Sequence, residues 1–379
     1  SADTLDIALS GDLENNATLA GRKVVSLSAE NVKNLGGRIR GTDVGIEAGQ
    51  DLAVDGGRVE ATDRLAVLAG RDLSVASTTR STATAQGNYT GIDRIAGLYI
   101  TGSTAAGELI AAAGRDLGLT AATVENAGQG STVLSAGRDL NLATVTTARR
   151  QETVWDASNY RKDANSQEVG TTLDVAGKLR LEAGQDIALR AASITSDKGA
   201  LDVLAGRDIA LSSGRETLSM AEAHRDTDSN IFGSETSISR QTRARDSSLS
   251  TTLSANTVRL QSGRDIGLTG SNVASTAGTS LLAGRDIRIE ADTDRLQESR
   301  YSETRQSGLI SSSGIGVTIG SRMQSLDNGD VRTTAASSTV GSIEGDVLID
   351  GVDDDEVIAG AMHFGKLEFH GVPYHLCWL

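Results

Sequence analysis

This chain of 379 residues contains very little cysteine, proline or aromatic side chain. Cys377 is the single cysteine, so no disulfide can form within the chain. Pro373 is the single proline, and every residue before it therefore has a backbone N–H that can donate to a strand ladder. Aromatic residues amount to 3%, whereas glycines number 43. These scarcities argue against a conventional thick core and indicate a thin core of aliphatic side chains.

Positive charge and long apolar runs are also scarce. The net charge is −14, and no dense stripe of lysine and arginine is available to displace counterions from phosphates, so we expect no nucleic-acid partner. No run of about eighteen apolar residues occurs, so we expect no membrane span. The sequence opens without a signal peptide and inside a repeat pattern, which indicates a segment of a longer protein.

What the chain does have is a repeated turn, Gly-Arg-Asp, flanked by Ala or Ser before it and Leu or Ile after it. Neighbouring copies, including Gln variants at Gly49 and Gly184, recur at a period of roughly 22 residues, which is typical of solenoids. Three gaps between successive copies are about twice this period or longer, which indicates coils that carry insertions. Insertions in solenoids emerge as loops on one face. The copies are Gly70-Arg71-Asp72, Gly114-Arg115-Asp116, Gly137-Arg138-Asp139, Gly206-Arg207-Asp208, Gly263-Arg264-Asp265 and Gly284-Arg285-Asp286.

Within each repeat, apolar residues alternate with polar ones. Leu65, Val67 and Ala69 precede one turn, and Leu73 and Val75 follow it. This period of two predicts strands with one face inward. A third short strand completes the repeat. Three short strands in a repeat of this length predict an all-β fold, a parallel β-helix. In such a fold each strand pairs with its copies one coil above and one coil below. The third strands are marked by Val124, Ile194 and Val273.

The Gly-Arg-Asp turns are best explained as corners of the coil. We expect the glycine to supply a positive φ or a close approach between backbones. The aspartate can accept hydrogen bonds from local backbone N–H groups in an Asx-type turn. Stacked aspartates repel one another, and the neighbouring arginine offsets this by placing positive charge in the aspartate column. We therefore interpret these residues as architecture rather than as a ligand site.

Four insertions interrupt the short repeats, at about residues 77–108, 148–172, 215–254 and 293–341. Their sequences, rich in Ser, Thr, Arg and Glu, predict long hairpins or extended excursions that lie against the rod. They also carry most of the rare aromatic side chains, the residue type that dominates contact energies in interfaces. Five of these are our candidate partner contacts, with plugging of irregular coils as the alternative: Tyr99, Trp155, Tyr160, Phe232 and Tyr301.

The composition changes near Gly351. Residues 1–350 hold the repeats, whereas residues 351–379 contain an acidic run, three of the four histidines, and the single proline and cysteine. We expect a boundary here, the tail being the start of a different domain or residues foreign to the rod. The spacing of its histidines and Cys377 matches no metal-ligand pattern, and its acidic run is not an EF-hand loop. We expect no metal and no cofactor.

No catalytic motif stands out. The sequence lacks a Gly-x-x-x-x-Gly-Lys-Ser/Thr loop, a Gly-x-Ser-x-Gly elbow and a His-Glu-x-x-His helix, and His224 is the single histidine before the tail. Parallel β-helices can host polysaccharide lyases and hydrolases, but these gather carboxylates in one groove beside aromatic platforms. Here the aspartates are spread along the chain. We therefore expect a structural and interaction protein, not an enzyme, and keep a polysaccharide-cleaving enzyme as the alternative.

The repeats resemble the haemagglutinin repeats of filamentous haemagglutinin-type exoproteins. The resemblance rests on residues 69–75 (Ala-Gly-Arg-Asp-Leu-Ser-Val), their copies, and residues 339–347 (Thr-Val-Gly-Ser-Ile-Glu-Gly-Asp-Val), and it covers about residues 1–350. Insertions that open with Glu-Thr are similar to the second class of such repeats, found in contact-dependent growth-inhibition toxins. These proteins cross the outer membrane by two-partner secretion.

The resemblance implies a right-handed parallel β-helix in a secreted, outer membrane-associated surface filament. It also implies an outer-membrane secretion partner, and a role in adhesion to a receptor or glycan on a target cell or in toxin delivery. In the second case, the longer protein would carry a C-terminal toxin domain matched by an immunity protein. The sequence contains neither the secretion domain nor a toxin domain, so both roles stay open.

Overall fold

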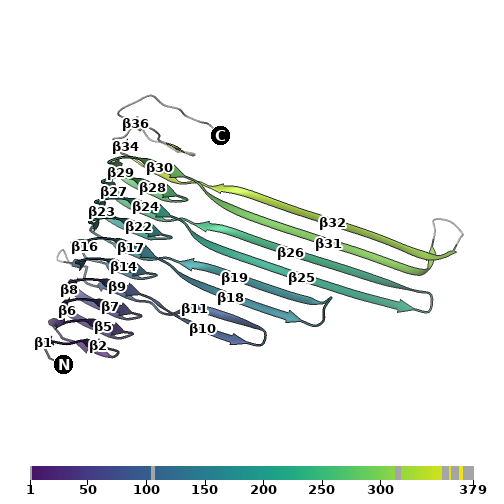
Figure 1. Ribbon diagram of the computed structural model, residues 1–379, viewed down its shortest axis with the longest axis horizontal. Helices are drawn as coiled ribbons and strands as arrows, with labels where there is room; N and C mark the ends of the chain where they lie inside the picture. The colour runs from purple at the N-terminus through teal and green to yellow at the C-terminus, as the bar shows by residue number, and fades with distance from the viewer. Residues whose placement is uncertain (1, 104–106, 312–316, 352–357, 360–366, 370–379) are drawn as a thin grey trace.

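The computed structural model describes residues 2–103, 107–311, 317–351, 358–359 and 367–369, and every regular element within them is a β-strand. Two parallel sheets form a stacked rod, and a third, antiparallel sheet projects from its side (Figure 1). The larger parallel sheet contains β1 (Thr4–Ala8), β3 (Thr18–Ala20), β4 (Val24–Ala29), β6 (Arg38–Ala48), β8 (Arg58–Ala69), β12 (Gly97–Ile100), β13 (Glu108–Ala113), β15 (Thr123–Asn126), β16 (Ser131–Ala136), β20 (Thr172–Val175), β21 (Lys178–Ala183), β23 (Ser193–Ala205), β27 (Thr252–Ser262), β29 (Asn272–Ala283), β33 (Thr339–Ser342), β34 (Val347–Gly351) and β36 (Leu367–Phe369).

The smaller parallel sheet consists of the strands that follow each Gly-Arg-Asp turn and their equivalents. Its strands are β2 (Leu13–Asn15), β5 (Val32–Leu35), β7 (Leu52–Asp55), β9 (Leu73–Ala76), β14 (Leu117–Thr120), β17 (Leu140–Ala143), β22 (Ile187–Arg190), β24 (Ile209–Ser212), β28 (Ile266–Thr269), β30 (Ile287–Glu290) and β35 (Ile358–Ala359).

The strands stack in register because their apolar positions repeat. Leu52 lies beside Leu73, Leu73 beside Leu117, and Leu117 beside Leu140, and each of these side chains is buried. The sequence separation of each pair equals the spacing of the turns that precede its strands, as predicted, because both repeat once per coil. A short strand has little stability alone, whereas stacking pairs its backbone with two neighbours and makes the inward aliphatic column continuous. The fold is all-β with parallel sheets stacked as in a β-helix.

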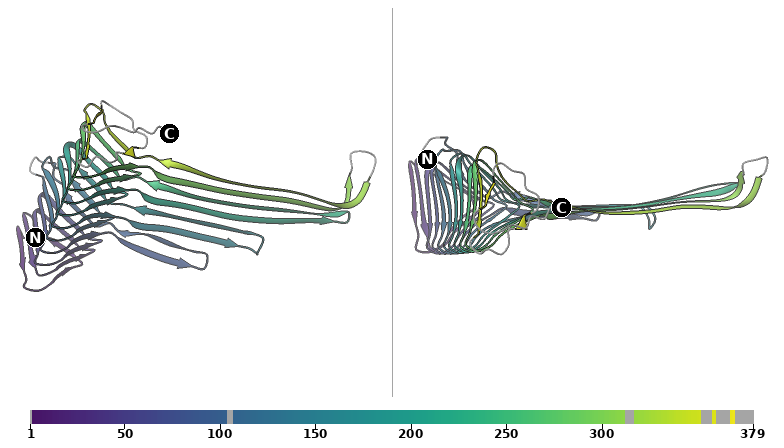
Figure 2. Two further views of the ribbon diagram at one scale, coloured as in Figure 1. Left: turned by 45° about the horizontal axis from the view of Figure 1, so that its top comes forward. Right: turned by 90° about the horizontal axis from the view of Figure 1, so that it is seen from above.

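The insertions form four hairpins that project away from the rod. The prediction of hairpins is confirmed, and the alternative of excursions lying against the rod is wrong. Each hairpin pairs with its neighbour, so that together they form one antiparallel sheet, here called the fin, and the view from above shows it as a single thin layer (Figure 2). The hairpins are β10 (Thr78–Thr84) with β11 (Gly87–Arg94), β18 (Val145–Val154) with β19 (Tyr160–Val169), β25 (Gly214–Asn230) with β26 (Gly233–Leu249), and β31 (Asp292–Ser311) with β32 (Val317–Ala336).

The fin is continuous because hairpins leave every second coil. They follow β9, β17, β24 and β30, whereas the coils of β14, β22 and β28 between them turn directly into their third strands. Neighbouring strands in a sheet lie about 4.8 Å apart, so two coils raise the chain by about 9.6 Å, which is also the width of a two-stranded hairpin. Each hairpin therefore emerges where its outer strand can bond to the next hairpin.

The corner from which the hairpins emerge is also where the backbone is left-handed. In the short coils this corner holds positive-φ residues, including Gly56 at 60°, and Ala121 and Ala191 at 46°. The Gly-Arg-Asp glycines are not among the described residues with positive φ, so our expectation of a positive φ at those glycines is wrong. The corner that requires a left-handed backbone is the other one, between the second and third strands of the coil.

The predicted boundary at residue 351 stays a prediction. Residues 352–357, 360–366 and 370–379, which include the acidic run and the tail's histidines and Cys377, lie outside the described residues. Within the tail, β35 pairs in parallel with β30, and β36 pairs in parallel with β34.

Candidate functional site: the corner columns and the fin

The Gly-Arg-Asp glycines stack directly upon one another, and this close approach explains why they are glycines. A Cβ added to Gly137 would overlap the carbonyl oxygen of Gly114 and lie 2.9 Å from its carbonyl carbon. The same overlap recurs between Gly70 and Gly49 and between Gly284 and Gly263. The close-approach expectation is therefore confirmed, whereas the positive-φ expectation is not.

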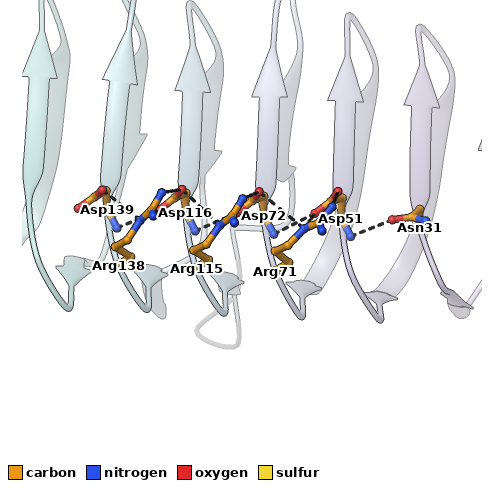
Figure 3. A network of polar contacts seen from close by, with 8 residues as sticks. All are labelled: Asn31, Asp51, Arg71, Asp72, Arg115, Asp116, Arg138 and Asp139. Atoms are coloured by element: carbon orange, nitrogen blue, oxygen red, sulfur yellow. Dashed lines mark hydrogen bonds and ion pairs between the residues drawn. The ribbon is translucent and has the colours of Figure 1, made fainter.

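The arginines and aspartates of the Gly-Arg-Asp turns form an ionic column that runs from coil to coil (Figure 3). The guanidinium of Arg71 binds the carboxylate of Asp51 in the coil before it, with its Nε donating over 2.7 Å, and Arg115 binds Asp72 in the same way over 2.8 Å. In each pair Nε donates to one carboxylate oxygen and Nη2 donates to the other, the bidentate geometry in which an arginine pair is strongest. Further pairs join Arg138 to Asp116, Arg207 to Asp186, Arg264 to Asp208 and Arg285 to Asp265. The expected interleaving of arginine and aspartate charge is confirmed.

The aspartates also join coils through the backbone. The carboxylate of Asp51 accepts the backbone N–H of Asp72 over 3.4 Å, and Asp72 accepts that of Asp116 over 3.3 Å. The expected local Asx turn is therefore wrong, since the donor lies one coil further along rather than in the same turn. Hydrogen bonds from Arg71 and Arg115 lower the pKa of Asp51 and Asp72 respectively, because they favour the ionised carboxylate.

Where glutamine replaces arginine, the alternation of positive and negative charge is interrupted, but the hydrogen bonds between successive coils continue. Gln185 stands where arginine would bind Asp139, yet Asp139 still accepts the backbone N–H of Asp186 over 3.2 Å. Gln50 stacks on Glu30 of the coil before it, and the side-chain amide of Gln50 donates a hydrogen bond to the Glu30 carboxylate. The backbone contact is therefore the constant feature of the column, and the arginine pair is an addition to it.

The six guanidinium groups of the column are all paired with carboxylates of the neighbouring coil. At each of these pairs the positive charge of the arginine is neutralised by the aspartate of the neighbouring coil. Among the described residues, no cluster of three or more His, Cys, Asp or Glu side chains has the arrangement needed to hold a metal ion. No helix long and apolar enough to cross a membrane occurs in the described part of the chain.

A shallow depression of about 420 Å³ lies on the fin, over β18, β19, β25, β26 and β31. Its carboxylates are paired, since Glu152 contacts Arg150 and Lys162. Asp163 likewise pairs with Arg161. These side chains belong to hairpins rather than to adjacent coils, so this depression differs from the groove that the enzyme alternative predicts.

The five candidate aromatic residues have different environments. Tyr99 belongs to β12 in the wall of the rod, is 7% exposed, and lies beneath the guanidinium of Arg58, whose central carbon is 4.2 Å from the ring centroid. Its expected role as a partner contact is therefore wrong, because the rod itself covers the ring. The alternative assignment to packing describes Tyr99 correctly.

Trp155 and Phe232 are the exposed members of the set. Trp155 follows β18 at the tip of its hairpin and is 70% exposed, and Phe232 occupies the turn between β25 and β26 and is 62% exposed. Tyr160 and Tyr301 are half-buried on the fin, where Lys162 and Arg240 respectively approach their rings. The structure thus separates two exposed aromatic tips from three rings with contacts inside the chain.

The sequence interpretation missed a row of exposed apolar residues on the outermost strand of the fin. These side chains lie in an insertion whose apolar residues follow no single period, so no alternation marks them. They are Ile319, Met323, Leu326 and Val331 on β32.

Comparison with known proteins gives consistent matches. The hemagglutinin repeat family matches residues 97–227 and 232–366. Curated relatives include a protein named tRNA nuclease CdiA from Escherichia coli (strain STEC_O31), 31% identical over 80% of this chain and 9% of that protein. Deoxyribonuclease CdiA from Dickeya dadantii (strain 3937) is 31% identical over the same shares, and tRNA nuclease CdiA-2 from Burkholderia pseudomallei (strain 1026b) is 26% identical over 62% of this chain and 8% of that protein.

The chain thus spans about a tenth of the length of these curated relatives. No solved structure matches the chain.

Proposed function

Because this chain belongs to the hemagglutinin repeat family, we propose that it is a segment of the stalk of a secreted, surface-attached protein that delivers a toxin to neighbouring cells. The relatives named CdiA support this role, since they are named as nucleases and a nuclease can serve as the delivered toxin. This chain matches less than a tenth of each, so we assign the nuclease activity to other parts of such proteins. In this proposal the chain itself catalyses no reaction.

The observation that carries the proposal is the unbroken corner column. Backbone bonds and glycine contacts join coil to coil from Gly49 to Gly284, although three hairpins leave the rod between these residues. A structure of this kind keeps two ends apart and transmits load along its axis, which is the requirement for a stalk. We further propose that the helix is right-handed, as parallel β crossovers almost always are.

The corner residues hold the stalk together in this proposal, and the aromatic tips contact partners. Trp155 and Phe232 are exposed at the ends of their hairpins, where large rings can enter a partner's surface. The longer protein would need an outer-membrane secretion partner and a receptor or glycan on the target cell. We place the stalk on the outside of the producing cell.

An in-frame deletion tests the stalk role. Removing residues 207–284 from the longer protein joins Gly206 to Arg285, which deletes one hairpin coil and one short coil while keeping the corner and the alternation of hairpins. We expect growth inhibition of target cells to persist. A control deletion of residues 207–273 joins the corner to the third strand and should abolish delivery, because the coils no longer stack in register.

Purified chain distinguishes delivery from adhesion. As a stalk, the chain alone should bind target cells weakly and leave their growth unchanged. Strong saturable binding of the chain alone to target cells would instead identify an adhesin, and Trp155→Ala and Phe232→Ala would then show whether the aromatic tips make that contact. Delivery that is lost in both deletions, or retained in both, would contradict the role of a stacked stalk.

A further inference from the structure

A buried hydroxyl bridges the base of each hairpin, between the point where the chain leaves the rod and the point where it returns. We propose that this hydroxyl closes the coil where the main chain departs, and that it is the feature which allows a coil to carry a hairpin. These four side chains, here called the staples, are 0–7% exposed and belong to Ser77, Thr171, Thr251 and Ser338.

Three staples act in the same way from the residue at which the chain returns. The Thr251 hydroxyl donates over 2.7 Å to the carbonyl of Ser212, the last residue of β24 before the third hairpin begins. Its oxygen accepts the backbone N–H of Ala192, in the short coil before it, over 3.2 Å. One hydroxyl thus joins the exit of the hairpin, its return and the neighbouring coil. The same two kinds of bond link Thr171 to Ala143 and Ala122, and Ser338 to Glu290 and Ser271.

The first hairpin has its staple at the exit instead. Ser77 precedes β10, and its oxygen accepts the backbone N–H of Ala96, where the chain returns to the rod, over 3.0 Å. The Ser77 hydroxyl donates to the carbonyl of Ala121 in the next coil. The bridged residues of the four hairpins are 19, 28, 39 and 48 positions apart in sequence. The closure therefore does not depend on the length of the hairpin.

The coils without hairpins close through two residues of main chain. Ala191, with a φ of 46°, turns the chain after β22, Ala192 follows, and β23 begins at the next residue. Ala121 and Ala122 make the same corner between β14 and β15. Two kinds of closure thus alternate along the rod from β9 to β30, a staple in each hairpin coil and a left-handed corner in each short coil.

The staples are needed because a backbone group inside the rod would otherwise have no partner. Ala192 is 1% exposed, and its N–H is bonded to the side chain of Thr251 rather than to a carbonyl. A buried N–H without an acceptor is costly, and buried backbone groups in proteins are almost always bonded. A hydroxyl can accept this N–H and donate its own proton at the same time. An apolar side chain of the same size at residue 251 could do neither.

Removal of one hydroxyl tests the staple. Thr251→Val keeps the shape of the side chain, and we expect hydrogen exchange in peptides covering residues 187–196, which include the Ala192 N–H, to accelerate about thirtyfold. Thr251→Ser keeps the hydroxyl and should stay within about fivefold of the native chain, the difference reflecting the lost methyl group. If Thr251→Val fails to fold, Thr171→Val provides the same comparison at the second hairpin through the Ala122 N–H.

The matched control is Thr252→Val, the same change one residue later. The Thr252 side chain faces outward from β27, next to the inward Leu253. We expect it to change exchange in the same peptides by less than about threefold, because a β-branched side chain is kept at a partly exposed strand position. Thr172 provides the corresponding control for Thr171, since it is exposed at the start of β20.

Excision of the first hairpin tests whether the two closures are equivalent. Deleting residues 78–95 with Ser77→Gly joins Ala76 through one glycine to Ala96, which copies the short corner of the next coil. Exchange in β14 and β15 should stay within about threefold of the native chain. The same deletion with Ser77→Val should raise it at least about tenfold, because a β-branched residue is strained in the left-handed region.

Equal exchange in Thr251→Val and Thr252→Val overturns the proposal. So does a Thr251→Ser variant that exchanges as fast as Thr251→Val, since packing of the methyl group would then explain the effect. Loss of the stacked rod in the glycine-closed excision, or equal protection with glycine and valine at residue 77, contradicts the equivalence of the two closures.

Discussion

Replacing a corner glycine by alanine should be costly although its φ is not left-handed. In Gly137→Ala the new Cβ would overlap the Gly114 carbonyl oxygen and lie 2.9 Å from its carbon, whereas carbon atoms in contact stay about 3.5–4.0 Å apart. The two coils must therefore separate locally. The bonds at risk are Gly137 N–H to the Ala113 carbonyl, 2.9 Å, and Arg138 N–H to the Arg115 carbonyl, 2.7 Å.

The expected cost follows from these contacts. Overpacking typically costs about 1–3 kcal/mol, and each weakened backbone hydrogen bond adds about 1 kcal/mol. We expect Gly137→Ala to lower the free energy of unfolding of this part of the rod by about 2–4 kcal/mol. Gly118→Ala is the matched control, because nothing lies within 4 Å of its added Cβ, and it should be neutral or stabilising by about 0.5–1 kcal/mol.

Hydrogen exchange followed by mass spectrometry measures this effect locally, since coils of a solenoid are coupled mainly to their neighbours. Protection of peptides covering residues 131–143 should fall in Gly137→Ala and stay unchanged in Gly118→Ala, and urea unfolding followed by circular dichroism should rank the two variants in the same order. Equal effects of the two substitutions would refute the close-contact explanation of the glycine column.

Three further predictions concern the other corner, the ionic column and the core. Ala121→Gly should raise the midpoint of thermal unfolding, with a gain of up to about 1 kcal/mol, because φ is 46° there and glycine adopts this region freely; a fall would contradict the strain. Asp72 has a lowered pKa, so its pair with Arg115 stabilises the rod above about pH 4 and loses its contribution as pH falls through the folded value. Asp72→Asn should therefore reduce the acid sensitivity of stability, as measured by urea unfolding at several pH values, and unchanged pH dependence would count against this. Asn126→Ala should cost about 2 kcal/mol in urea unfolding, since the buried amide donates to the Gly107 carbonyl and to Thr132, and a loss below about 0.5 kcal/mol would show that these bonds contribute little.

The coil could be predicted from sequence because its constraints are local and repeated. Alternation around Leu65 and Val67 marks an inward face, and the spacing of the turns measures the coil directly. The ion pair between Arg115 and Asp72 could be predicted from the stacking of the coils alone. Repetition made each of these inferences testable several times within one chain.

The fin could not be predicted in the same way, because its pairing is between distant segments. β19 pairs with β25 although Gln167 and Glu216 are far apart in sequence, and neither hairpin has an apolar face that a core would select. The strict alternation of long and short gaps between successive turns, from Gly70 to Gly284, contained the necessary information. This alternation predicts one continuous sheet of hairpins only when the width of a hairpin is compared with the rise of two coils.

The role of the corner glycines and the fate of Tyr99 were missed for a related reason. A glycine required for φ and a glycine required for contact look alike in sequence, and the difference depends on the coil above. Tyr99 was grouped with the insertions by position, whereas β12 is already part of the wall and its ring is covered by Arg58 from the coil before. Both errors concern contacts between coils.

The distance between equivalent positions on distant coils tests the stacking most directly. Spin labels at Glu47 and Gln261, with Cys377→Ser, would occupy exposed outward positions joined by six successive parallel pairings, through Leu68, Ala112, Ser135, Glu182 and Leu204. At about 4.8 Å per coil, double electron–electron resonance should give a narrow distribution centred near 29 Å, despite the long chain between the labels. A broad distribution, or one centred well beyond this distance, would contradict the stacked rod.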